Sequence, residues 1–238
     1  GSDPHEHDPT PKEIDRLQQA DAVVYLRGFQ PALDRAIDSL PKRIMRIDLF
    51  DGLQRLADDP HVWLSPATMQ HMANATATAF EQLVADRPPQ KNLADHTIAE
   101  HLAGYLASLT ELDNAMRDGL AHCATRTIVS SHRSFGYLAR DYQLEQASIA
   151  GLSPGDEPSA KQLQTMIDLA RRKHVATIFF DRNMPSDLAR TVAQSTGARV
   201  AVLDPVETFT AAQVKRGDTY VSVMRQNLAE LRTGLECR

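Results

Sequence analysis

Three histidines lie at positions where a protein can bind a metal ion. His5 lies in a proline-rich loop before a predicted helix, and His61 lies in a proline-flanked loop before another. His132 directly follows the predicted strand at 127–130. Ligands of open α/β sheets bind outside the carboxyl ends of the strands, and three imidazoles in one such crevice would suit Zn²⁺ or another borderline divalent cation. Three unrelated loop histidines are the alternative, and the residue pattern leaves both open.

Two acidic residues could add an oxygen ligand to such a site. Asp181 ends the apolar run 177–180, and Glu207 follows the last predicted strand. An acid at the end of a strand is also a common N-cap of the following helix. The other histidines outside the N-terminal loop lie in or beside predicted helices and are interpreted as surface or capping residues: His71, His96, His101, His122 and His174.

Patterns of well-known catalytic sites are missing from the sequence. Ser130-Ser131-His132 lacks the GxSxG elbow of a serine hydrolase. The chain contains no HExxH motif, no phosphate-binding P-loop and no glycine-rich dinucleotide motif. The sequence leaves one enzymatic alternative, a metal-dependent hydrolase that uses the same residues. In it, Glu207 would act as a general base beside a metal position that is free for water.

Apolar runs and helical patterns alternate along the chain, which predicts an α/β fold with parallel sheets flanked by helices. The predicted strands cover residues 22–26, 44–49, 127–130, 146–150, 177–180 and 199–203. The predicted helices cover residues 10–20, 30–39, 66–85, 92–120, 134–142, 159–173, 186–196 and 220–235. The helix at 92–120 would be about 40 Å long and could join two lobes. We therefore expect an N-terminal lobe at 1–91, a linking helix at 92–121 and a C-terminal lobe at 122–238.

Composition restricts the function classes further. The 238 residues are 42% apolar and carry a net charge of −5, which is typical of a globular protein and argues against a general nucleic-acid-binding surface. No apolar run approaches the ~18 residues of a membrane span. The two cysteines, Cys123 and Cys237, form no CxxC metal knuckle and could form one disulfide in an oxidising compartment.

Six segments, in order along nearly the whole chain, carry a resemblance to a known family. They are DPHEHDPTP at 3–11, ADAVVY at 20–25, DPHVWLSP at 59–66, SHRSFGY at 131–137, GLSPGDEPS at 151–159 and LDPVE at 203–207. These segments resemble the zinc/manganese ABC-transporter solute-binding proteins, the ZnuA-like group of cluster A-I. The resemblance implies two lobes that capture a metal ion between them and deliver it to a membrane permease.

The ligand set implied by this resemblance is His5 and His61 from the N-terminal lobe, with His132 and Glu207 from the C-terminal lobe. Imidazole at the His132 position favours Zn²⁺, with Mn²⁺ as the less favoured ion. Asp204 is the alternative acid, and His7 is a candidate auxiliary ligand. The resemblance also implies a protein without enzymatic activity that acts outside the cytoplasm, in the periplasm or lipid-anchored at the outer face of the cytoplasmic membrane. We expect a monomer, and an adhesin-like surface protein is a further alternative.

The chain differs from the family pattern in several places, two of which concern its strands and a possible ligand. The family has a strand, a helix and a second strand before its DPH segment, so we expect only two strands in the N-terminal lobe of this chain. Asp181 stands where the family usually has glutamate. Actinobacterial members carry cysteines at both positions found here, which implies a Cys123–Cys237 disulfide, with two free thiols as the alternative.

Overall fold

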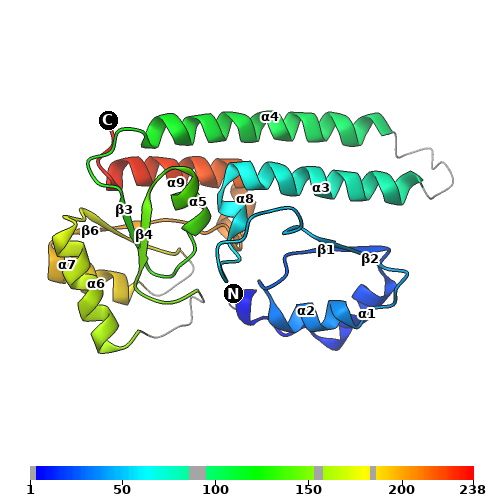
Figure 1. The fold of residues 1–238 in the computed structure, drawn as a ribbon, viewed down its shortest axis with the longest axis horizontal. Coiled ribbons are helices and arrows are strands. Elements are labelled where there is room, and N and C mark those ends of the chain that lie inside the picture. Colours follow the sequence, from blue (N-terminus) through cyan, green and yellow to red (C-terminus); the bar gives the residue numbers. More distant parts are fainter. Residues whose placement is uncertain (1–3, 86–94, 153–157, 183–185) are drawn as a thin grey trace. The chain divides into compact units, whose positions relative to one another are not determined.

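Short parallel strands form two separate sheets in the computed structural model, which describes residues 4–85, 95–152, 158–182 and 186–238 (Figure 1). The first sheet pairs β1 (Ala22–Tyr25) with β2 (Met45–Asp48). The second sheet has the order β4-β3-β5-β6 and consists of β3 (Thr127–Ser130), β4 (Glu145–Ser148), β5 (Thr177–Phe180) and β6 (Arg199–Val202). The predicted α/β fold with parallel sheets flanked by helices is confirmed.

Each of the eight predicted helices is present with ends shifted by at most a few residues. They are α1 (Pro11–Gln19), α2 (Pro31–Asp38), α3 (Pro66–Ala85), α4 (Asp95–Leu120), α5 (Gly136–Asp141), α6 (Ala160–Arg172), α7 (Asp187–Thr196) and α9 (Tyr220–Gly234). The sequence did not predict the short elements η1 (Pro4–Glu6), η2 (Val62–Leu64) and α8 (Ala211–Arg216). The predicted start of α1 is confirmed in detail, because Thr10 and Glu13 form a reciprocal capping box.

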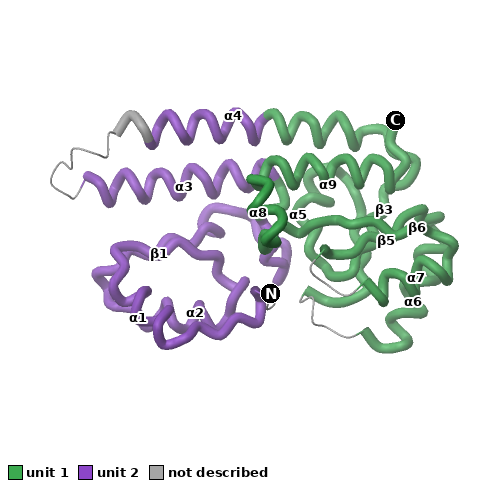
Figure 2. Tube along the Cα trace, turned by 180° about the vertical axis from the view of Figure 1, so that it is seen from behind, with its two compact units in different colours: residues 1, 63–65, 111–238 green, residues 2–62, 66–110 purple. Residues whose placement is uncertain are grey.

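Figure 2 colours the two compact units of the chain separately. Among the described residues, unit 1 contains Trp63–Ser65 and those from Glu111 to Arg238, and unit 2 contains those from Pro4 to Val62 and from Pro66 to Thr110. Helix α4 contributes to both units, since the division falls between Thr110 and Glu111. The predicted boundary at residue 91 lies outside the described residues, and the three-part division stays a prediction.

Helices cover both faces of the four-stranded sheet of unit 1. Successive side chains of each strand point to opposite faces and pack against these helices. On β5, Ile178 packs with Val129 of β3 into a core with residues of α6 and α7. On the opposite face, Phe179 lies against Gly234 of α9, where an added Cβ would come within 2.4 Å of the ring. Because both faces of the sheet are covered, all four residues of β3 are buried.

Unit 2 builds its small core under the two-stranded sheet. Val23 of β1 packs with Ile37, Leu40 and Ile44, which belong to α2 and to the segment before β2. In the described residues this sheet has two strands. A two-stranded sheet has little stability alone, so the packing of α1 and α2 is needed to hold the loops that follow β1 and β2.

A disulfide joins Cys123 to Cys237 within unit 1, as expected. The two cysteines also form an isolated antiparallel bridge, and the Thr125 N–H donates to the Leu235 carbonyl at 3.2 Å. These contacts attach the end of the chain to the segment that leads into β3. The disulfide therefore fixes α9 against the strand that ends near His132.

We expect Tyr142→Phe to destabilise unit 1 by about 1–3 kcal/mol at neutral pH, because Asp113 loses a donor. The Tyr142 hydroxyl donates to Asp113 Oδ1 at 2.8 Å. Burial, followed by this hydrogen bond, raises the pKa of Tyr142 above its ordinary value. The stabilisation is thus fully present below about pH 10, where free tyrosine titrates, and is lost as the pH rises further.

Urea unfolding at pH 7 and above pH 10 measures both effects. The variant should unfold at lower urea at pH 7 and lose less stability than the parent chain at alkaline pH. Identical curves for the two proteins at both pH values would contradict this assignment.

Candidate metal centre

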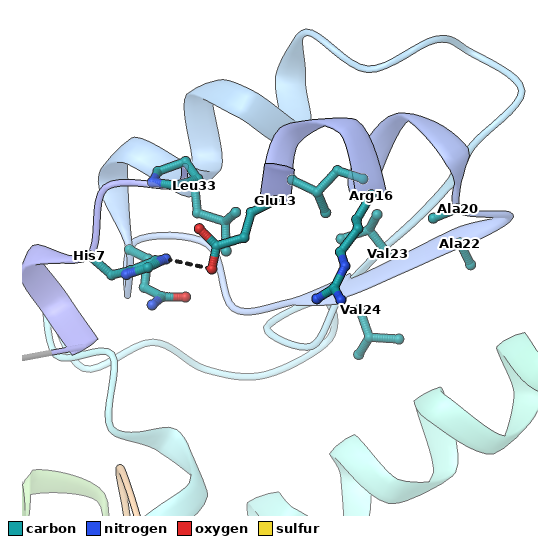
Figure 3. Close-up of a pocket in the computed structure, with 11 residues that line it drawn as sticks. His7, Glu13, Arg16, Ala20, Ala22, Val23, Val24 and Leu33 are labelled. Atoms are coloured by element: carbon teal, nitrogen blue, oxygen red, sulfur yellow. Dashed lines mark ion pairs between the residues drawn. The ribbon is translucent and has the colours of Figure 1, made fainter. Parts of the chain in front are cut away.

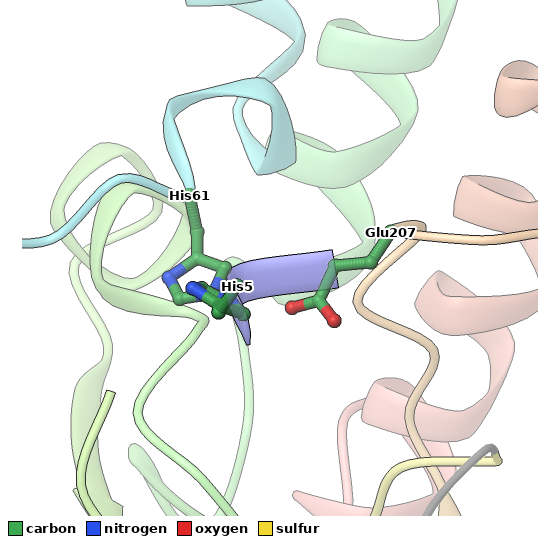
Figure 4. Close-up of side chains that lie close together, drawn as sticks. All are labelled: His5, His61 and Glu207. Carbon is green, nitrogen blue, oxygen red and sulfur yellow. The ribbon is translucent and has the colours of Figure 1, made fainter. Parts of the chain in front are cut away.

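Two of the predicted ligands, His5 and His61, lie next to each other in unit 2. Their Nε2 atoms are 3.2 Å apart and their ring centroids 5.0 Å apart, so the two rings turn the same nitrogen towards each other (Figure 4). His61 is fully buried. Two converging imidazole nitrogens supply half of the ligands of a tetrahedral zinc site.

Asp59 sets the tautomer of His61. Its Oδ1 lies 2.7 Å from His61 Nδ1 and also accepts the His61 backbone N–H at 3.0 Å. The carboxylate therefore accepts a hydrogen bond from the Nδ1–H of the neutral ring, which leaves the Nε2 lone pair available to a metal ion. Asp59 is itself buried, so the pair is shielded from competing water.

The segment that follows β1 positions His5. Gln30 Nε2 donates to the Pro4 carbonyl at 2.9 Å, and the Phe29 ring meets the His5 ring edge-on with centroids 4.7 Å apart. Gly28 permits the turn before Phe29, since its φ of +94° is unfavourable for residues with a Cβ. His5 is thus placed by the carboxyl end of a parallel strand, as the sequence predicted for a ligand.

The other two predicted ligands, His132 and Glu207, lie together in unit 1. His132 Nε2 is 3.3 Å from Glu207 Oε1, and both side chains are almost fully buried. His132 follows β3, and its carbonyl accepts from Ser130 Oγ at 2.7 Å, which fixes the backbone at the strand end. Glu207 lies on the loop after β6 (Figure 4).

Asp204, the alternative acid, holds the Glu207 loop in shape. Its carboxylate accepts from the Val206 N–H at 2.9 Å and from Gln213 Nε2 at 3.0 Å, and Arg182 Nε lies 3.5 Å away. Val206 adopts a φ of +54°, which is strained for a β-branched residue. This sharp bend directs the following residue, Glu207, towards His132. Asp204 is therefore a positioning residue.

His7, the candidate auxiliary ligand, contacts Glu13. Its Nε2 is 3.3 Å from Glu13 Oε1, and both line a largely apolar pocket of about 520 Å³ beside β1 (Figure 3). Glu13 is the capping-box residue of α1, so His7 extends a helix-capping network. This contact gives His7 a structural role.

The structure brings the four predicted ligands together as two pairs, one pair in each unit. Sequence reasoning did not find the role of Asp59, although its position two residues before His61 was visible in the DPH segment. It also treated Asp181 mainly as an N-cap, whereas a carboxylate oxygen of Asp181 lies within 4.8 Å of ligand atoms of His132 and Glu207. One unit thus offers two imidazoles and the other offers an imidazole with carboxylates, a donor set that suits Zn²⁺.

We expect Asp59→Asn to weaken Zn²⁺ binding roughly 10–100-fold, because asparagine removes the negative charge that orients and polarises the His61 ring. Calorimetric titration of both proteins measures the change. Asp58→Asn is the matched control, since it changes the neighbouring exposed acid. Equal losses in the two variants would show that the effect is one of net charge and would contradict the role of Asp59.

A family model described as the zinc-uptake complex component A, periplasmic, matches residues 1–234 of the chain. The chain is 32% identical over 253 residues to the zinc-binding lipoprotein AdcA of Streptococcus pneumoniae strain R6, a match that covers 98% of this chain and 49% of that protein. It is also 32% identical over 255 residues to the high-affinity zinc uptake system protein ZnuA of Bacillus subtilis strain 168, covering 98% of this chain and 77% of the relative. The chain therefore spans about half the length of its AdcA relatives.

The solved structure of the Zn(II)-bound ZnuA-like domain of Streptococcus pneumoniae AdcA superposes with a TM-score of 0.83 at 33% identity, covering 99% of this chain and 88% of that one. The laminin-binding protein Lmb of Streptococcus agalactiae, described as a bifunctional protein with adhesin and metal transporting activity, superposes with a TM-score of 0.85 at 26% identity, covering 99% and 88%. These relatives come from Streptococcus and Bacillus, and the actinobacterial resemblance of the cysteines stays a prediction. With its match over residues 1–234, the chain belongs to the ZnuA family of periplasmic zinc-uptake components.

Proposed function

We propose that this chain is the solute-binding part of a zinc ABC importer, which captures Zn²⁺ and delivers it to a membrane permease. The proposed ligands are His5 and His61 of unit 2 with His132 and Glu207 of unit 1, all on one ion. The observation that carries the proposal is that each unit places a pair of ligand side chains together, with the facing atoms 3.2 Å apart in one unit and 3.3 Å apart in the other. Two such pairs supply the four ligands that Zn²⁺ takes in tetrahedral sites.

The donor set favours carriage of the ion over catalysis. Three neutral imidazoles and one carboxylate fill four positions, whereas a catalytic zinc keeps one position open for water. Imidazole nitrogens also favour Zn²⁺ over Mn²⁺, which prefers oxygen ligands. We therefore propose a binding protein without enzymatic activity, and the printed names of its relatives, which are zinc-binding and zinc-uptake proteins, support this.

The proposed place of action is outside the cytoplasm. The AdcA relative is named a lipoprotein, and the family description is periplasmic. The Cys123–Cys237 disulfide agrees with an oxidising compartment. None of the helices in the described residues is long and apolar enough to cross a bilayer. We propose that the chain acts as a monomer and meets its permease from that side of the membrane.

Calorimetric titration with Zn²⁺, together with elemental analysis of the purified protein, tests the proposal. One tight Zn²⁺ equivalent per chain is expected. Mg²⁺ is the control ion and should show no comparable binding, because it prefers octahedral oxygen ligands. A folded protein that binds no zinc tightly, or that binds both ions alike, would refute the proposed function.

A further inference from the structure

Unit 1 brings a second carboxylate to its pair of ligands. Ligand atoms of His132, Asp181 and Glu207 all lie within 4.8 Å of one another. His132 and Asp181 are 1% and 3% exposed, and the Glu207 side chain is 4% exposed. An imidazole and two carboxylates thus form a buried cluster inside one compact unit.

The topology of the sheet places this cluster at its switch point. From β3 the chain passes through α5 to β4 on one side, and it then returns through α6 to β5 on the other side of β3. His132 follows β3 and Asp181 follows β5, and the two strands are direct neighbours. Open α/β sheets bind ligands in the crevice at such a reversal, outside the carboxyl ends of the strands.

The backbone fixes Asp181 at this edge of the sheet. Its N–H donates to Ser131 Oγ at 3.1 Å, which ties the end of β5 to the residue before His132. The guanidinium of the next residue, Arg182, lies 3.5 Å from Asp204 Oδ2. The ends of β3 and β5 therefore hold Asp181 beside His132.

The chemistry of the cluster suits a cation. The carboxylates of Asp181 and Glu207 lie within 4.8 Å of each other in a buried place, so two negative charges there repel. A divalent cation would compensate both negative charges at once. The imidazole adds a nitrogen ligand, so the cluster offers three ligand groups without any from unit 2.

We propose that His132, Asp181 and Glu207 bind the ion first, and that Asp181 leaves the ion when His5 and His61 complete the four-ligand site. This inference rests on the proposed function and adds an order of loading to it. The two oxygen ligands make this first site accept Mn²⁺ as well as Zn²⁺, since carboxylates suit the harder ion. Discrimination in favour of Zn²⁺ then comes from the two imidazoles of unit 2.

The test uses the double variant His5→Ala, His61→Ala, which keeps the cluster of unit 1 intact. It should still bind one Zn²⁺ or one Mn²⁺ per chain in calorimetry, more weakly than the parent chain binds Zn²⁺ and with less difference between the two ions. Adding Asp181→Asn should weaken the remaining binding of both ions roughly 10–100-fold. Adding Asp181→Glu instead should restore most of the binding, because the carboxylate is kept.

Two controls separate ligation from a loss of folding. Asp113→Asn changes another carboxylate of unit 1, which is bonded to Tyr142, and should leave metal affinity unchanged. The Co²⁺ absorption spectrum of the double variant should change with Asp181→Asn and not with Asp113→Asn, because only a ligand alters the ligand field. If the variant with Asp181→Asn folds poorly, Asp181→Glu in the double variant is compared with the double variant alone. The Zn²⁺ affinity and the Co²⁺ spectrum of these two proteins then test whether the carboxylate at position 181 binds the ion.

The outcomes distinguish this inference from the proposed function. A parent chain that binds Zn²⁺ tightly while the double variant binds neither ion would overturn the loading order and leave the proposed function standing. Residual binding that Asp181→Asn does not change would overturn the role of Asp181. A parent chain that binds no Zn²⁺ would overturn the proposed function itself.

Discussion

Replacing His61 with alanine is expected to weaken Zn²⁺ binding on the order of 100–1,000-fold. Structural zinc sites with four ligands bind with about 10–16 kcal/mol, so an equal share for one ligand is roughly 2.5–4 kcal/mol. His61 is fully buried, and its Nε2 faces the Nε2 of His5. Water that enters the vacated space is a weaker ligand than an imidazole that Asp59 already orients.

His71→Ala is the matched control for this prediction. His71 also lies in unit 2, and its Nε2 is 2.7 Å from the Asp51 carbonyl in an exposed position. Calorimetric titration in the presence of a competing chelator measures both affinities. A loss of less than tenfold for His61→Ala, or an equal loss for His71→Ala, would contradict the assignment of His61 as a ligand.

Removal of the disulfide is expected to cause the largest loss of stability. Cys123 and Cys237 are 114 residues apart, and a closed loop of roughly 100 residues corresponds to about 4.7 kcal/mol in the chain-entropy model. Native disulfides commonly contribute about 2–5 kcal/mol. For a protein of this size we expect the melting temperature of the variant Cys123→Ala, Cys237→Ala to fall by roughly 5–15 °C.

Thermal melts of the variant and of the parent chain, with and without reductant, measure this effect. Reductant should lower the melting temperature of the parent chain and leave that of the variant unchanged. Tight Zn²⁺ binding should persist in the folded variant, because neither cysteine belongs to the proposed ligand set. A variant that melts with the parent chain would show that the crosslink adds no stability.

The elements that position the ligands follow from local patterns in the sequence. The capping box at Thr10 and the proline at the start of α3 were sufficient to predict where these helices begin. Apolar runs such as 177–180 predicted strands correctly because both faces of this parallel sheet are buried. The short α8 was missed, because six residues between turns carry too little periodicity to distinguish a helix from a loop.

The site itself was only partly predictable from residue types. The sequence named His5, His61, His132 and Glu207 through a family resemblance, and the pairing within each unit then appeared in the structure. The contribution of Asp181 depends on the order of the strands, because only the adjacency of β3 and β5 brings it beside His132. The positive φ of Val206, which directs Glu207, depends on contacts of Asp204 with distant residues such as Asn227.

The central claim is that one Zn²⁺ ion takes its ligands from both pairs, and paired deletions test it most directly. Zn²⁺ titration would compare the parent chain with two double variants, His5→Ala with His61→Ala, and His132→Ala with Glu207→Gln. The account predicts one tight equivalent for the parent chain and only much weaker Zn²⁺ binding in each double variant. Two tight equivalents in the parent chain, or a double variant that keeps the parent affinity, would contradict it.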